Sequence, residues 1–285
     1  LRTMQQYTWN FGIQRQVTSK LFASATYLGS HMLHVWNAVE LNPAQYLGTG
    51  PCTLQTPTGP VSYPVCSTAA NIDQRRLLNL INPQANLSYV TQFDDGGTQG
   101  YQGLLLDMRW RSNQSLNISG NYTLSHCIGL PIINLLNPGA NYPHGPYQNN
   151  GPQGRNMDTG NCTQDRRHIL NTTVVAKTPS FSNNTLRLVA SGWSFSTIFQ
   201  VRSGQPLNIV IGTDVASSGF NGTQRPNQVL ATPYGDRESL TSYFNSAAFA
   251  VPAAGTYGNG GFNNVVGPGF WQWDQAVTRE FQIRE

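Results

Sequence analysis

Apolar and polar residues alternate strictly over residues 115–126, and this is the clearest pattern in the chain. The apolar positions are Leu116, Ile118, Gly120, Tyr122 and Leu124, and the polar positions between them are Asn117, Ser119, Asn121, Thr123 and Ser125. A period of two predicts a β-strand with one apolar face and one wet face. The same alternation recurs over residues 7–13, 104–110 and 193–201, and more weakly over 168–176 and 273–281.

Several of these segments have about the 9–11 residues that a strand needs to cross a membrane in a β-barrel. Helical periodicity is nearly absent, and only residues 75–81 suggest one short helix or turn. The pattern therefore predicts an all-β, antiparallel fold.

The connections between the predicted strands alternate in length. Residues 17–20 and 112–114 form tight turns and 178–186 a moderately short one, whereas 30–99, 127–165 and 203–270 are long and rich in Gly, Pro and Asn. Outer-membrane barrels combine short periplasmic turns with long extracellular loops in this way. A secreted β-sandwich, whose apolar strand faces form a core, stays open as the alternative.

A barrel defines a direction for every strand and an environment for each face. We expect segments near 5–17, 100–111, 166–177 and 271–283 to run toward the periplasm and those near 20–29, 115–126 and 190–202 to run outward, all in one antiparallel sheet with unpaired first and last strands. Leu116, Ile118, Tyr122 and Leu124 would then point to lipid, and Asn117, Ser119, Asn121 and Thr123 to the lumen. Arginine is expected to be tolerated worse at Ile118 than at Ser119.

Composition agrees with a protein that touches lipid on one side and water on the other. Charged residues make up 11% of the 285 residues, less than half the usual share, and lysine occurs only at Lys20 and Lys177. No basic run supports nucleic-acid binding, and no stretch of about 18 apolar residues predicts a transmembrane helix. Because Leu1 already lies in a strand pattern with no signal peptide before it, we expect the chain to be truncated at its N-terminus.

The four cysteines contain no C-x-x-C pair, so zinc-ribbon and thioredoxin sites are disfavoured. We predict two disulfides, Cys52 with Cys66 and Cys127 with Cys162. The first would close a Pro- and Thr-rich segment without a strand pattern. The second would join the feet of one long loop, if the flanking strands are antiparallel neighbours. Four unpaired cysteines remain the alternative.

Few residues suggest a catalytic, metal or ligand-binding site. Asp165 and His168 could form an acid–base pair, but a structural corner beside Cys162 is the simpler interpretation. His31 and His34 form a loop pair without metal-ligand spacing, and Ser30 and Ser203 lack the nucleophile-elbow glycines. We therefore predict no catalytic, cofactor or metal site. The loop aromatics either contact an extracellular ligand or pack the loops together; the main candidates are Tyr142, Tyr147, Tyr243 and Phe244.

Ordered sequence blocks across nearly the whole chain resemble one family. They are QQYTWNFGIQRQ (5–16), YLGSH (27–31), NYTLSHC (121–127), GNCTQDRRH (160–168), GW (192–193), SGQP (203–206), QRPN (224–227), YFNSAAF (243–249) and GTYGN (255–259). In order and spacing the chain resembles the barrel of TonB-dependent receptors of the Oar-like type, which are abundant in acidobacteria.

The resemblance implies a barrel of about 22 strands, an N-terminal plug, often a carboxypeptidase-regulatory-like domain, and energy from the inner-membrane TonB complex. Residues 1–285 would be a partial barrel of about seven to ten strands, without the plug, the regulatory-like domain or the C-terminal strands. The implied location is the outer membrane of a Gram-negative bacterium.

The expected function is binding and import of a nutrient such as a glycan, a peptide or a metal chelate. The expected partners are outer-membrane lipid, an extracellular ligand and, through the missing N-terminal part, the TonB complex. Two other classes stay open: a structural or adhesive outer-membrane barrel without active uptake, and the secreted β-sandwich.

Overall fold

Seven long strands form one antiparallel sheet in the computed structural model, which describes residues 1–112, 115–130, 157–219 and 224–281. The strands are β1 (Gln5–Thr18), β2 (Leu21–Glu40), β5 (Thr91–Arg111), β6 (Leu116–Gly129), β8 (His168–Lys177), β9 (Trp193–Arg202) and β14 (Phe270–Arg279). They are hydrogen-bonded in this order, and the two-residue β7 (Gly160–Asn161) adds to β6. The predicted antiparallel all-β fold is confirmed.

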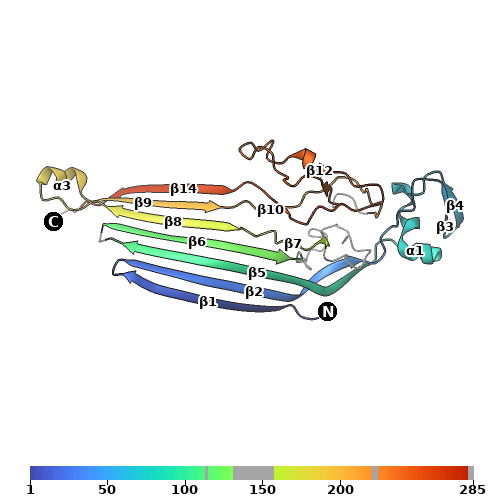
Figure 1. The fold of residues 1–285 in the computed structure, drawn as a ribbon, viewed down its shortest axis with the longest axis horizontal. Helices are drawn as coiled ribbons and strands as arrows, with labels where there is room; N and C mark the ends of the chain where they lie inside the picture. The colour runs from blue at the N-terminus through green and yellow to red at the C-terminus, as the bar shows by residue number, and fades with distance from the viewer. Residues whose placement is uncertain (113–114, 131–156, 220–223, 282–285) are drawn as a thin grey trace.

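Short connections lie at one end of the sheet and long ones at the other (Figure 1). We call them the turn end and the loop end. The turn end holds the β1–β2 and β5–β6 turns and the β8–β9 connection, as the alternation of connection lengths predicts. The sheet is open, with β1 and β14 at its two edges.

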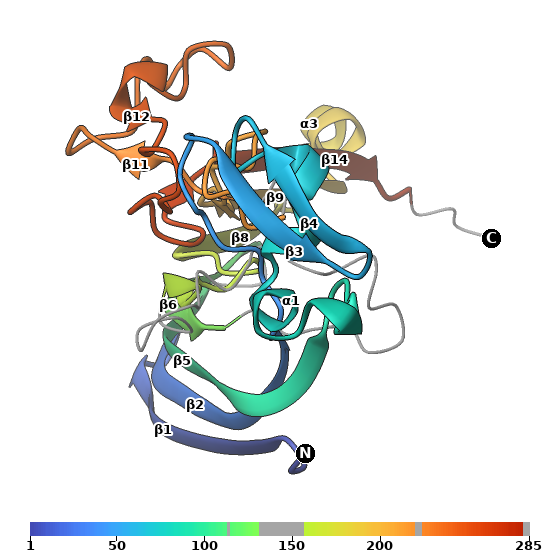
Figure 2. The ribbon, with the colours of Figure 1, turned by 90° about the vertical axis from the view of Figure 1, so that its right-hand side faces the viewer.

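The long connections carry their own small elements, which Figure 2 shows gathered at the loop end. They include three two-stranded sheets: β3 (Cys52–Thr56) with β4 (Gly59–Tyr63), β10 (Pro206–Leu207) with β13 (Val265–Val266), and β11 (Asn227–Gln228) with β12 (Phe249–Ala250). Helix α1 (Leu77–Ile81), preceded by a 3₁₀ turn at Asp73–Arg75, lies where a short helix is predicted.

Three sequence expectations need correction. The sequence pattern predicts a loop at residues 31–40 and 91–99, but these residues extend β2 and β5, so His31 and His34 lie in a strand. Register shifts at Leu33/Val35 and Val35/Asn37, with a positive φ of 56° at His34, interrupt the alternation that would have revealed these extensions.

The second correction concerns the segment between Cys52 and Cys66, which forms the β3–β4 hairpin despite its lack of a strand pattern. The third concerns helix α3 (Asn184–Ala190), which occupies the β8–β9 connection where only a turn was expected. The side chain of Asn183 caps it by accepting hydrogen bonds from the backbone N–H groups of Thr185 and Leu186. Among the described residues, no helix is long and apolar enough to cross a membrane.

The long strands lie in this single sheet, and within the described residues no second sheet of similar length packs on it. The face-to-face arrangement of a β-sandwich is therefore absent from the described part of the chain.

Candidate functional site: the polar face of the sheet and the loop cap

Strand register divides the sheet into a polar and an apolar face. One register row crosses all seven strands with polar residues, and the neighbouring row crosses them with apolar ones. The polar row is Gln14, Ser24, Asp107, Asn121, Asn171, Gln200 and Gln272, and the apolar row is Ile13, Ala25, Leu106, Tyr122, Leu170, Val201 and Trp271. Paired residues share a face and adjacent residues do not, so the two rows point in opposite directions. The expected separation of Leu116, Ile118, Tyr122 and Leu124 from Asn117, Ser119, Asn121 and Thr123 follows the same two faces.

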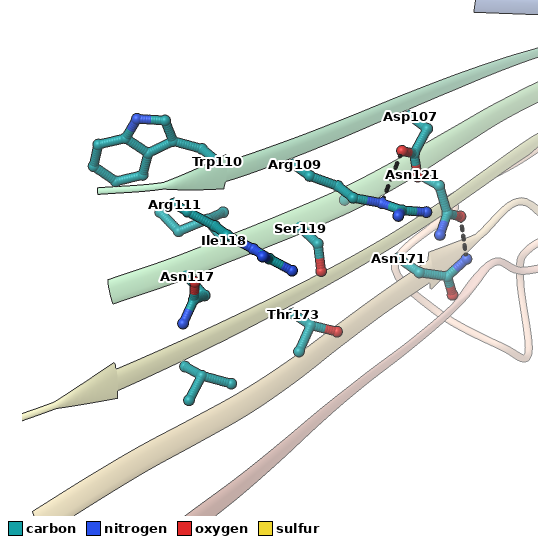
Figure 3. A pocket seen from close by; sticks show the side chains of 12 residues that line it. Asp107, Arg109, Trp110, Arg111, Asn117, Ile118, Ser119, Asn121, Asn171 and Thr173 are labelled. Carbon is teal, nitrogen blue, oxygen red and sulfur yellow. Dashed lines mark hydrogen bonds and ion pairs between the residues drawn. The ribbon is translucent and has the colours of Figure 1, made fainter. Parts of the chain in front are cut away.

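A hollow of about 730 Å³ lies over β5, β6 and β8 and is lined largely by the polar face. In it Arg109 Nε lies 3.3 Å from Asp107 Oδ1, and Asn171 donates from Nδ2 to Asn121 Oδ1 at 2.8 Å (Figure 3). Ser119 and Thr173 add hydroxyl groups to the same surface. These side chains offer donors, acceptors and one ion pair, which suits contact with water, a hydrated solute or a polar protein segment.

The described parts of the three long connections, residues 41–90, 157–167 and 203–269, form what we call the loop cap. Many of its buried residues are polar, and among them the side chain of Arg75 is fully buried. The guanidinium donates to Asn71 Oδ1 at 2.9 Å, to the carbonyl of Ser217 at 2.9 Å and to that of Thr68 at 3.0 Å, and also to the Gln45 carbonyl. Burial lowers the pKa of Arg75, and the Coulombic attraction of Asp214 opposes this shift.

A second buried arginine joins two of the long connections. Arg225 forms an ion pair with Asp158, with Nη1 and Oδ1 2.7 Å apart, and both side chains are buried. Its remaining donors bind the carbonyls of Gly260 and Met157, each at 2.7 Å. Arg225 thus links residues 157–158 to the 203–269 connection, as Arg75 links that connection to residues 41–90.

Asp214 and Tyr257 lie close together in the same interior. Asp214 accepts hydrogen bonds from the backbone N–H groups of Ser218 at 3.0 Å and Gly219 at 2.6 Å, and from the side chain of Gln224. Burial raises the pKa of Tyr257 to about 12, and the carboxylates of Asp214 and Asp158 add to the shift. The Tyr257 phenol is therefore neutral at any physiological pH.

Both predicted disulfides are present. Cys52 pairs with Cys66 across the β3–β4 hairpin, and Cys127 pairs with Cys162, with Cα–Cα distances of 5.2 and 5.3 Å. The Cys162 N–H also donates to the Cys127 carbonyl at 3.0 Å, so the feet of this long loop meet at one rim, as the neighbouring strands require.

Asp165 and His168 are not brought together as an acid–base pair. The Asp165 carboxylate accepts the Cys127 N–H at 3.1 Å and lies 3.3 Å from His126 Nδ1, while His168 Nδ1 lies 2.7 Å from the Tyr122 hydroxyl. The structural-corner interpretation is the one that this geometry supports. Among the described residues, no group of three or more His, Cys, Asp or Glu could hold a metal ion.

The two described candidates for ligand contact pack within the loop cap. Tyr243 and Phe244 stack edge to face with ring centroids 5.0 Å apart, and both contact the ring of Tyr234. The Tyr243 hydroxyl donates to the Gly267 carbonyl at 3.1 Å. These contacts fit loop packing better than an open binding surface. Tyr142 and Tyr147 lie outside the described residues.

Sequence reasoning missed the buried arginines Arg75, Arg76 and Arg225. The QRPN block that contains Arg225 carries the resemblance, but nothing in its residue types indicates burial.

A family model described as an outer membrane beta barrel domain matches residues 1–285. Comparison with curated proteins and with solved structures gave no significant match.

Proposed function

Because this chain belongs to the outer membrane β-barrel family and is therefore located in the outer membrane, we propose that it forms part of the barrel wall of a TonB-dependent receptor that imports a nutrient. The family favours a non-enzymatic barrel. The proposed cargo is a glycan, a peptide or a metal chelate, and the proposed energy source is the TonB complex, reached through an N-terminal part of the protein.

The observation that carries the proposal is the uninterrupted polar row across seven strands, opposite an uninterrupted apolar row. In a barrel with its apolar face toward lipid, the polar row lines the interior. The hollow around Asp107 and Asn121 would then face a lumen and could contact a plug or a passing solute.

The loop cap supports a receptor role in a second way. Ordering long loops costs considerable conformational entropy. Two buried arginines and two disulfides offset this cost and hold the long connections in a defined arrangement. Ordered loops over a barrel mouth provide the preorganised surface on which a receptor selects its ligand.

The test measures accumulation of labelled oligosaccharides, oligopeptides and ferric chelates by cells that express the complete protein, with and without a functional TonB complex. Uptake of one class that disappears without TonB is the expected result. Replacing Asn121 and Asn171 together by leucine should lower that uptake several-fold, whereas Leu124→Ile on the apolar face should leave it unchanged.

A structural or adhesive barrel without active uptake is the competing proposal. It predicts that none of the three classes accumulates in a TonB-dependent manner, and that deletion of the gene instead weakens attachment of cells to one another or to a surface. Such a pair of results would replace the transport proposal.

A further inference from the structure

Helix α3 is placed at the turn end of the sheet, beside the ends of β8, β9 and β14 (Figure 1). Its sequence, NTLRLVA, is mostly apolar, and the large side chains are exposed: Leu186 by 50%, Leu188 by 72% and Val189 by 61%. An exposed apolar helix at this position requires an explanation, because a turn at a barrel end needs only polar residues.

Two hydrogen bonds fix α3 to the apolar face of the sheet. The indole N–H of Trp193 donates to the Val189 carbonyl at 2.8 Å, and the Arg279 guanidinium donates to the Leu188 carbonyl. These carbonyls belong to the last turn of the helix, where the backbone lacks intrahelical partners. Trp193 and Arg279 are register partners, and they share a face with the next pair, Phe195 and Val277. The helix is therefore attached where the apolar face ends.

Cations and aromatic rings meet at the same place. The Arg279 guanidinium carbon lies 5.1 Å from the ring centroid of Trp193 and 4.6 Å from that of Phe281, and Phe281 is 69% exposed. Arg187 lies on the helix itself. Trp and Arg at the end of a lipid-facing surface suit the headgroup layer, where the ring contacts acyl chains and the cation meets phosphate.

We propose that α3 is an interfacial anchor that lies in the phospholipid leaflet at the turn end, which in an outer-membrane barrel is the periplasmic side. Leu186, Leu188 and Val189 lie among the upper acyl carbons, and Arg187 and Arg279 lie at the depth of the phosphates. The proposed contact is with phospholipid because the helix continues the apolar face of β9 and β14. In addition, the cations Arg187 and Arg279 complement the charge of the phosphate. Nutrient import does not require this anchor, so the inference goes beyond the proposed function.

The test uses the complete protein in vesicles of phosphatidylethanolamine and phosphatidylglycerol. Leu188→Cys carries a nitroxide spin label, and the matched control is Leu240→Cys in the loop cap, where the native leucine is 83% exposed. Electron paramagnetic resonance measures collisions of each label with oxygen, which is enriched in acyl chains, and with a water-soluble nickel chelate. We expect the oxygen-to-nickel ratio to be several-fold higher at position 188 than at position 240.

A second pair of measurements separates lipid burial from burial by protein. Adding Leu186→Ser and Val189→Ser to the labelled Leu188→Cys protein should move its ratio toward the value at position 240, and the loop-cap substitution Val251→Ser should not. Equal ratios at positions 188 and 240, in protein that is correctly inserted, would overturn the proposal. So would a low collision rate with both reagents at position 188, since this would show that protein covers the helix.

Discussion

The sheet exposes large apolar side chains, whereas the loop cap buries charged ones. On the sheet, Phe11, Trp271 and Val277 are more than half exposed, whereas in the loop cap Arg75, Arg76 and Arg225 are almost completely buried. The sheet satisfies its backbone through the strand ladder and can turn apolar side chains toward lipid. The cap has irregular backbone, and its buried carbonyls need donors that regular pairing does not supply. Arginine, with five N–H groups, fills that need.

The difference teaches that stability has separate sources in the two regions. Backbone pairing holds the sheet, while a few buried charges and two disulfides, one of them formed with Cys127 of β6, hold the cap. Changes that damage one region should therefore leave the other largely intact.

Replacing Arg225 by methionine should have the largest effect and should act on the cap alone. The substitution removes one partner of the buried ion pair between Arg225 and Asp158, a change that costs about 3–5 kcal/mol. Hydrogen exchange should accelerate for amides of residues 157–167 and 203–269 and stay unchanged in β5 and β6. Arg237→Met, at an exposed position of the cap, is the control. Equal acceleration in the sheet would mean that cap and sheet form one cooperative unit.

Removing the disulfide between Cys127 and Cys162, by changing both residues to alanine, should lower the stability of the cap by about 3–4 kcal/mol. The bond closes a loop with a sequence separation of 35, and the estimate follows from the entropy that such closure removes from the unfolded chain. Protease resistance of the cap measures the loss. Peptide mapping of non-reduced protein from the outer membrane checks the pairing itself, and a peptide that links Cys52 to Cys127 or Cys162 would contradict it.

Arginine substitutions on the two faces of the sheet should differ by about 2–4 kcal/mol. Leu106 lies in the apolar row, nearer the middle of the sheet than Ile118, and Asn121 lies in the polar row. Leu106→Arg should reduce folding into vesicles, as measured by the free energy of unfolding in denaturant, whereas Asn121→Arg should cost much less. Equal losses would show that the two faces do not meet different solvents.

Alkaline pH should loosen the cap before it affects the sheet. The pKa of Tyr257 is raised to about 12, above its usual value of 10. The stability that the neutral phenol contributes to the cap is therefore complete below pH 10 and is lost as the pH rises toward 12. The shift of about two units corresponds to roughly 2–3 kcal/mol. Hydrogen exchange in the cap, corrected for the intrinsic rate, should rise over this range in the native protein. Tyr257→Phe should show a smaller rise, and identical profiles for both proteins would remove Tyr257 as the cause.

Local sequence patterns predicted most of the sheet and little of the cap. Strict alternation in β6 and the contrast between short and long connections predicted the antiparallel order, and the order in turn predicted the bond between Cys127 and Cys162. The loop ends of β2 and β5 escaped detection, because the bulges near His34 shift the alternation by a residue. Helix α3 also escaped detection, because the residues before it, among them Pro179 and Asn183, are typical of a turn.

The sequence by itself determined the two faces of the sheet, because in a strand the side chain of each residue points opposite to that of its neighbour and the pattern can be read directly. Only the tertiary structure decided which polar residues of the cap become buried. Arg75 meets Ser217 across 142 residues, and Arg225 meets Asp158 across 67. Burial of these charges depends on contacts between distant segments of irregular backbone, and no local periodicity encodes them.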